Sequence, residues 1–195
     1  MQEVTAFILA GGQSSRMGRD KAFLQLGGRT LLQRALELAR AVATEVRIAG
    51  QKEKFACYAP VVEDLYPGRG PLAGIHAALR SSATELNLIL GVDTPFLEAA
   101  LLRYLVEQAE AGGAVVTVPR IGAKYEPLCA VYRRGFAELA EESLRAERNK
   151  IDPLFAMTSL RVVDQAELRT LAFDPGMFDN LNTAEEWEQA RRRQS

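Results

Sequence analysis

A segment rich in glycine, hydroxyl and cationic residues follows the first apolar run of the chain. The run Val4–Leu9 is apolar and partly β-branched, and Gly11, Gly12, Arg16 and Lys21 come after it. Glycine lets backbone N–H groups approach an anion closely, and cationic side chains add charge-assisted hydrogen bonds to phosphate. The segment has neither the Gly-Lys-Ser/Thr end of a Walker A loop nor the spacing of a dinucleotide fingerprint. It therefore predicts a phosphate-binding loop of another type, and the alternative is a plain turn with surface cations.

A single carboxylate, Asp93, follows a run that is apolar except for Asn87. The run Leu86–Leu90 is typical of a central strand, and Gly91 permits close approach to the backbone. Open α/β sheets bind ligands beyond the carboxyl ends of their strands, and a hard carboxylate beside phosphates suits Mg²⁺. We therefore expect Asp93 to hold magnesium next to a polyphosphate. The alternative is a turn, or a cap on the following helix.

A third candidate region joins a short apolar segment to a loop of prolines and glycines. Asp64 ends the segment, and residues 66–74 contain two prolines and three glycines. The backbone of such an irregular loop can read the edge of a flat ring, and the amides at a helix start can donate hydrogen bonds. The same residue types also fit an ordinary surface loop, so both interpretations stay open.

Strand-like and helix-like segments alternate along the chain, which is the pattern of an α/β sheet assembled from crossover units. We predict strands at residues 4–9, 45–49, 60–62, 86–90, 114–118, 127–132 and 160–163. We predict helices at residues 31–43, 71–80, 97–111 and 134–146, and a last helix capped by Thr183. With 195 residues we expect one domain, residues 1–195, that has a predominantly parallel central sheet flanked by helices.

Composition argues against several classes of function. Apolar residues make up 48% and charged residues 25% of the chain, and the formal net charge of −1 gives no case for nucleic-acid binding. The apolar runs are shorter than the roughly 20 residues that cross a bilayer, so we predict no membrane span. Cys57 and Cys129 lack metal-ligand spacing and, without a secretory signal, indicate reduced thiols in the cytoplasm. We interpret His76, the lone histidine, as a surface or packing residue rather than a ligand.

Ordered motifs resemble a known enzyme family. Leu-Ala-Gly-Gly at 9–12, Ser-Arg-Met-Gly at 15–18 and Asp-Lys at 20–21 look like the signature of nucleotidyltransferases that activate sugars and cofactors. Three further motifs narrow the resemblance to the molybdenum cofactor guanylyltransferase family: Gly-Pro-Leu-Ala-Gly-Ile at 70–75, Val-Asp-Thr-Pro at 92–95 and Asp-Asn-Leu-Asn-Thr-Ala-Glu-Glu at 179–186. The similarity covers most of the chain, from residue 4 to residue 188.

The resemblance implies a Rossmann-like nucleotidyltransferase fold and transfer of GMP from GTP to the phosphate of molybdenum-molybdopterin, with Mg²⁺ as cofactor and pyrophosphate as the second product. It implies that Arg16, Lys21 and Asp93 are catalytic and that Asp93 contacts both GTP and Mg²⁺. The residues that it implies bind GTP are Leu9, Ala10, Gly11, Gly12, Lys21, Asp64 and Asp93. Asn180 and Asn182 fall at positions that the family associates with the acceptor side.

One position departs from the family pattern, and two alternative functions stay open. Ala49 stands where the family has a nucleotide-contacting asparagine, so this contact is absent or comes from the backbone. A cytidylyltransferase making the cytosine cofactor is the nearest rival, although its relatives tend to carry Leu-Ala-Ala-Gly where Gly11 follows Ala10 here. The second is a non-catalytic GTP-binding module, against which the presence of Lys21 and Asp93 argues. Besides GTP and molybdenum-molybdopterin, the expected partners are other proteins of cofactor biosynthesis or target enzymes.

Overall fold

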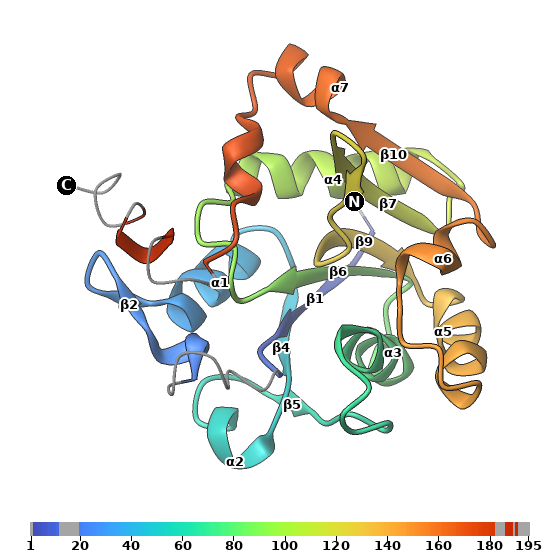
Figure 1. Cartoon of the computed structure of the whole chain (residues 1–195), viewed down its shortest axis with the longest axis horizontal. Helices are drawn as coiled ribbons and strands as arrows, with labels where there is room; N and C mark the ends of the chain where they lie inside the picture. Colours follow the sequence, from blue (N-terminus) through green and yellow to red (C-terminus); the bar gives the residue numbers. More distant parts are fainter. Residues whose placement is uncertain (1, 12–19, 182–185, 189, 191–195) are drawn as a thin grey trace.

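An entirely buried strand, β1 (Val4–Leu9), lies in the middle of a mixed sheet (Figure 1). It pairs in parallel with β4 (Glu45–Ala49) on one side and with β6 (Leu86–Gly91) on the other. The computed structural model describes residues 2–11, 20–181, 186–188 and 190. The further strands of this sheet are β5 (Val61–Val62), β7 (Val116–Ile121), β8 (Lys124–Tyr125), β9 (Cys129–Arg133) and β10 (Leu160–Asp164). Their order is β10-β7-β9-β6-β1-β4-β5, and β8 pairs with β7.

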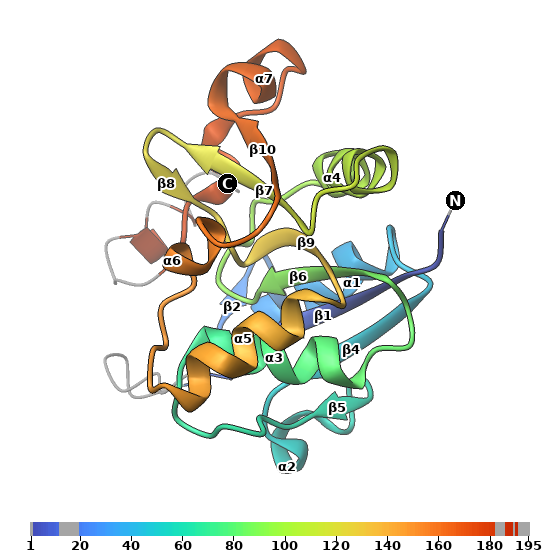
Figure 2. The same ribbon diagram turned by 90° about the vertical axis from the view of Figure 1, so that its right-hand side faces the viewer.

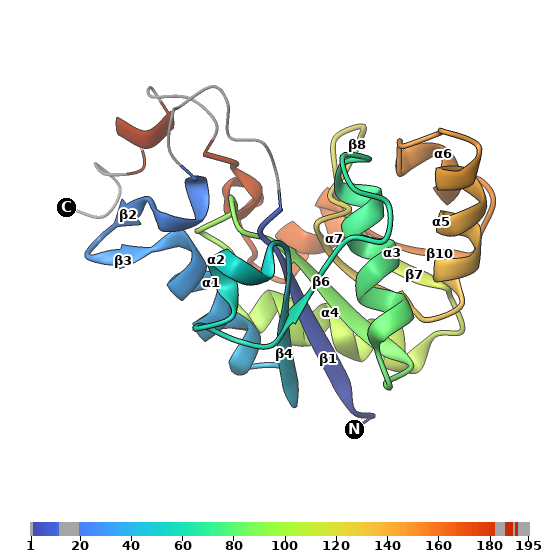
Figure 3. The ribbon, with the colours of Figure 1, turned by 90° about the horizontal axis from the view of Figure 1, so that it is seen from below.

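Helices cover both faces of the sheet because side chains along β1 alternate between two apolar clusters. Ala6 and Ile8 pack in the cluster that contains α1 (Leu31–Arg40) and α4 (Ala99–Ala111). Phe7 and Leu9 pack in the cluster that contains α3 (Pro71–Ser81) and α5 (Phe136–Arg145). Figure 2 shows α3 and α5 side by side, and Figure 3 shows α1 and α3 on opposite sides of β1 and β4.

Short elements fill the connections between these layers. They are η1 (Lys21–Phe23), the hairpin of β2 (Gln25–Leu26) and β3 (Arg29–Thr30), α2 (Lys52–Phe55), α6 (Asp152–Phe155), α7 (Gln165–Thr170) and η2 (Pro175–Phe178). The α/β fold with a mostly parallel sheet is confirmed, and the predicted strands and helices are present with ends shifted by a few residues. Two strands depart from the parallel direction: β9 runs antiparallel to both of its neighbours, β6 and β7, and the short β8 runs antiparallel to β7. The predicted cap Thr183 lies outside the described residues.

His76 is 1% exposed on α3 and its ring lies edge-on to Tyr66, so it is a packing residue. Among the described residues, no helix is both long enough and apolar enough to pass through a bilayer.

Candidate active site

Four parallel strands end in register at one edge of the sheet. The last residue of β1, Leu9, pairs with Ala49 of β4 and with Gly91 of β6. Ala49 in turn pairs with Val62, the last residue of β5. The segments that leave these strands therefore emerge side by side, at the edge where open α/β sheets bind ligands. They carry the predicted site residues Ala10, Gly11, Asp64 and Asp93.

The segment after β1 is held against the end of β4. The Ala10 amide donates to the Ala49 carbonyl at 3.1 Å, and Gly11 lies exposed beside Gly50. The side chain of Ala49 is buried in the apolar cluster with α3, so this position offers no polar side chain at the edge. The Ala49 carbonyl instead accepts the hydrogen bond from the Ala10 amide, and the Gly11 backbone lies exposed just beyond the strand ends.

Asp64 lies where β1 and α3 meet. A Cβ atom at Gly74 would lie 3.7 Å from Oδ1 of Asp64 and 3.3 Å from the side chain of Leu9. The glycine therefore permits close approach of three separate chain segments. Burial raises the pKa of Asp64, because a half-buried carboxylate loses part of its hydration. Hydrogen-bond donors on a ligand would replace the hydrogen bonds to water that the Asp64 carboxylate loses on burial.

Asp93 occupies a tight turn directly after β6. The Thr94 hydroxyl donates to the Gly91 carbonyl at 3.2 Å, and a Cβ atom at Gly91 would lie only 2.9 Å from Oδ1 of Asp93. The absence of a side chain at Gly91 therefore makes room for the Asp93 carboxylate. Asp93 does not cap the next helix, since α4 begins at Ala99 with Glu98 as its N-cap.

Lys21 lies on a neighbouring element whose position is fixed by Asp20. One carboxylate oxygen of Asp20 accepts from the Ala22 amide at 3.2 Å, and the other pairs with the Lys54 ammonium at 3.1 Å. The ring of Phe23 also stacks on Phe55, with 5.7 Å between centroids. These contacts attach η1, and hence the backbone of Lys21, to α2. Gly12, Arg16 and Asn182 lie outside the described residues, and their roles stay predictions.

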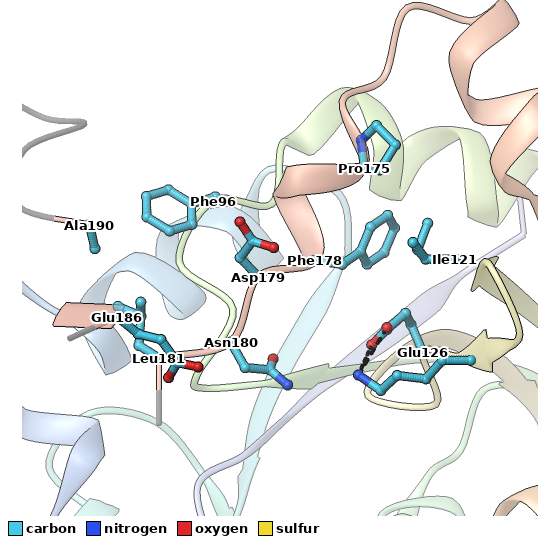
Figure 4. A pocket seen from close by; sticks show the side chains of 11 residues that line it. Phe96, Ile121, Glu126, Pro175, Phe178, Asp179, Asn180, Leu181, Glu186 and Ala190 are labelled. Carbon is cyan, nitrogen blue, oxygen red and sulfur yellow. Dashed lines mark hydrogen bonds and ion pairs between the residues drawn. The ribbon is translucent and has the colours of Figure 1, made fainter. Parts of the chain in front are cut away.

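A pocket of about 480 Å³ lies next to the Asp93 turn, and Asn180 is on its wall. The Leu181 amide, from the same wall, donates to the Asp93 carbonyl at 3.0 Å. Figure 4 shows the Asn180 side chain directed toward the side of the pocket that carries Glu126. The structure therefore places Asn180 close to Asp93, although the two are far apart in sequence.

The sequence analysis did not single out Glu126 and Lys124, which also line this pocket. Glu126 precedes β9, and in a sheet made only of parallel strands the start of a strand lies at the opposite edge. Because β9 is reversed and Cys129 pairs with Leu90, its start lies beside the end of β6. The sequence holds one hint, an acidic residue directly before Pro127 at the expected strand start, but nothing in it fixes the strand direction.

Acidic side chains lie both in the pocket and at the edge of the sheet where the parallel strands end. Burial raises the pKa of Glu126, which the Lys124 ammonium partly offsets and the carboxylates of Asp93 and Asp152 reinforce. Within the described residues, no group of three or more His, Cys, Asp or Glu side chains could hold a metal ion alone. Magnesium usually needs only one or two protein carboxylates, since substrate phosphates and water complete its shell. An oxygen donor such as Asp93, at the edge where open α/β sheets bind ligands, therefore fits Mg²⁺.

Comparisons with known proteins agree with this arrangement. A family model described as a MobA-like NTP transferase domain matches residues 6–161. A probable molybdenum cofactor guanylyltransferase of Pelotomaculum thermopropionicum is 40% identical over 98% of this chain and 93% of its own length. The molybdenum cofactor guanylyltransferase of Desulfosudis oleivorans is 37% identical over 97% of this chain and 95% of its own.

A solved structure has the same fold over nearly the whole chain. Molybdopterin-guanine dinucleotide biosynthesis protein A from Archaeoglobus fulgidus superimposes with a TM-score of 0.85 and 26% identity, covering 97% of both chains. The family model, the sequence relatives and the solved structure agree over residues 6–161, and the relatives and the solved structure each cover 97% or more of the chain. The chain belongs to the molybdenum cofactor guanylyltransferases of the MobA-like NTP transferase family.

Proposed function

We propose that this protein transfers GMP from GTP to the terminal phosphate of molybdenum-molybdopterin, forming the guanine dinucleotide cofactor and pyrophosphate in a Mg²⁺-dependent reaction. The observation that carries the proposal is the common edge at which β1, β4, β5 and β6 end, since Gly11, Asp64 and Asp93 all lie on the segments that leave it. The names of the relatives supply the identity of the two substrates.

Each part of this edge suits one part of GTP. The exposed Gly11 backbone provides N–H groups for the phosphates, and Lys21 and Arg16 provide positive charge. Asp64 accepts hydrogen bonds from the guanosine, which offsets the loss of hydration that raises its pKa. Asp93 is the residue that would hold Mg²⁺. Mg²⁺ held there would supply positive charge that offsets the charge of the phosphates.

The chemistry needs no activated side chain. The acceptor is a phosphate monoester that is already anionic at neutral pH, so one of its oxygens can attack the α-phosphorus of GTP directly. A new phosphoanhydride bond forms, the bond between the α-phosphorus and the bridging oxygen breaks, and pyrophosphate leaves. The barrier comes from repulsion between anions and from charge on the leaving group, so cationic and N–H donors supply most of the catalysis. The lone histidine, His76, is buried on α3 and takes no part.

The test is a nucleotide panel. The protein is incubated with Mg²⁺, molybdenum-loaded molybdopterin and each of the four nucleoside triphosphates in turn, and pyrophosphate is measured. Release that requires both GTP and the acceptor supports the proposal. Release with CTP alone would instead identify a cytidylyltransferase, and GTP binding without release would identify a binding module.

The variant Asp93→Ala examines the metal role within the same assay. We expect turnover to be abolished while GTP binding, measured by calorimetry, weakens less, because only one ligand of a phosphate-bound ion is removed. Glu107→Gln, an exposed change on α4, is the matched control and should leave both values unchanged. Wild-type turnover by Asp93→Ala at ordinary Mg²⁺ concentrations would contradict the assignment.

A further inference from the structure

Glu126 is a carboxylate that the fold buries in a pocket open to ligands. The residue is 9% exposed, and it lies just after the hairpin formed by β7 and β8. Among the described residues its carboxylate has one ion-pair partner, the Lys124 ammonium, at 3.1 Å from Oε1 and 3.4 Å from Oε2. The side chain of Lys124 is itself 65% exposed, so this partner approaches from the solvent side.

A carboxylate in this situation is short of hydrogen bonds. Its two oxygens can accept about four, and one ammonium group supplies only part of that number. Burial already raises the pKa of Glu126, which reflects the lost hydration. N–H donors on a bound molecule would compensate for the burial, and they would do so best as an adjacent pair that matches the two oxygens.

The pocket adjoins the position where transfer is proposed to occur. The Gly91 amide donates to the Leu128 carbonyl at 2.7 Å, which holds the segment after Glu126 against the end of β6. On the other wall, Leu181 is bonded to the Asp93 backbone. A molecule in the pocket therefore lies beside Asp93 but across β6 from Gly11 and Asp64, which face the nucleotide.

The walls of the pocket suit a flat polar ring. Phe96 and Phe178 provide apolar surface, and Asn180 provides both a donor and an acceptor near Glu126 (Figure 4). The volume of about 480 Å³ falls in the ordinary range for small-molecule sites. Three acidic side chains, Glu126, Asp179 and Glu186, line the pocket together with the ammonium group of Lys124.

We infer that Glu126 determines acceptor specificity, because its two carboxylate oxygens accept hydrogen bonds from adjacent N–H groups of a heterocycle in this pocket. The inference rests on the proposed function, in which the acceptor carries a pterin. The amino-pyrimidinone ring of a pterin presents its 2-amino group and its N3–H side by side, which matches a carboxylate. The Lys124 ammonium favours the charged form of the carboxylate, and Asn180 contacts the remaining ring edge.

A binding measurement tests this inference without catalysis. Wild-type protein is titrated with 6-hydroxymethylpterin and with 6-hydroxymethyllumazine, in which an oxo group replaces the 2-amino group, and ligand fluorescence is followed. We expect the pterin to bind at least about 10-fold more tightly, because hydrogen bonds to a charged group are strong and lumazine turns one donor into an acceptor. No pterin binding, or equal binding of both compounds, would overturn the inference even before any variant is made.

The isosteric variant Glu126→Gln then assigns the preference to this side chain. An amide can donate to the oxo group of lumazine, so the preference for pterin should disappear, whereas Glu107→Gln should keep it. Thermal unfolding monitored by circular dichroism verifies that both variants fold. A Glu126→Gln protein that folds and still prefers pterin would refute the role of Glu126.

Kinetics separate this inference from the proposed function. In Glu126→Gln the KM for molybdenum-molybdopterin should rise about 10- to 100-fold while the KM for GTP stays unchanged. If the wild-type protein releases no pyrophosphate from GTP, the proposed function fails. If the wild type is active and Glu126→Gln has an unchanged acceptor KM, only the assignment of Glu126 fails.

Discussion

Replacing Gly91 with alanine is expected to displace the Asp93 carboxylate without removing it. The added Cβ would lie 2.9 Å from Oδ1 of Asp93 and 3.3 Å from Cβ of Leu128, so both neighbours must move by a few tenths of an ångström. Overpacking of this kind costs about 1–3 kcal/mol, and the smaller conformational freedom of unfolded alanine offsets about 0.4–1 kcal/mol. The difference between these two ranges is a net loss of at most about 2.6 kcal/mol, which should lower the Tm by at most about 10 °C.

The displacement of the Asp93 carboxylate should also slow catalysis. A 1 Å misplacement at a reacting centre can cost about 100-fold in rate, so a shift of a few tenths of an ångström predicts a loss of about 10-fold in kcat. The assays are thermal unfolding by circular dichroism and pyrophosphate release with GTP, Mg²⁺ and acceptor.

Gly112→Ala is the matched control for Gly91→Ala. Its Cβ would lie 3.2 Å from the Gln108 carbonyl oxygen at the end of α4. The added methyl group therefore crowds the helix backbone, but at a place outside the candidate site. We expect it to lower the Tm with no change in kcat. A Gly91→Ala protein that keeps the wild-type kcat would refute the reasoning that Gly91 makes room for a functional Asp93.

Three further predictions concern other parts of the chain. Lys21→Ala should lower the rate of pyrophosphate release by orders of magnitude, because a cation opposite the leaving group is lost; an unchanged rate would remove Lys21 from the phosphate site. Thr30→Ala should lower the free energy of unfolding, measured in urea, by about 1 kcal/mol. The reason is that the Thr30 hydroxyl accepts a hydrogen bond from the backbone N–H of Gln33 at 3.1 Å, as part of a capping box. Thr30→Ser should keep most of that stability, and an equal loss in both variants would contradict the capping explanation. Burial lowers the pKa of His76, so its neutral form contributes stability that is present above about pH 6.5 and is lost as the pH falls through the lowered pKa. His76→Phe should therefore flatten the decrease in Tm between about pH 7 and pH 5, and identical pH profiles for both proteins would count against this account.

The long elements could be predicted from the sequence because local pattern and tertiary environment agree there. The run Leu86–Leu90 is apolar except for Asn87 and forms a strand buried on both faces, and the helix predicted to start at residue 31 is α1, which starts at Leu31. The short elements depend on contacts that sequence does not display. The four-residue α2 has no side-chain cap, and it is held by Phe55, which is buried beside Gly50.

The candidate site likewise has residues that the sequence could indicate and a residue, Glu126, that it could not. Gly11, Asp64 and Asp93 each follow one of the parallel strands, and the general rule that ligands bind beyond the carboxyl ends of such strands made Asp93 a candidate from the sequence. Glu126 required knowledge of the direction of β9, which depends on pairing between distant residues such as Leu90 and Cys129. Hydrophobic periodicity is the same for a strand that runs up or down, and it therefore could not reveal this wall of the pocket.

Because strand β9 is reversed, the loops on the two sides of β6 at the common edge come from different parts of the chain. Residues before Asp93 supply the loops on one side of β6, whereas the turn at Gly122 and the segment up to Leu128 supply the other side. A change in the length or composition of that turn leaves the hydrogen bonds of β1 with β4 and β6 intact. Natural variation can therefore alter which second substrate is accepted while the hold on the nucleotide is inherited unchanged.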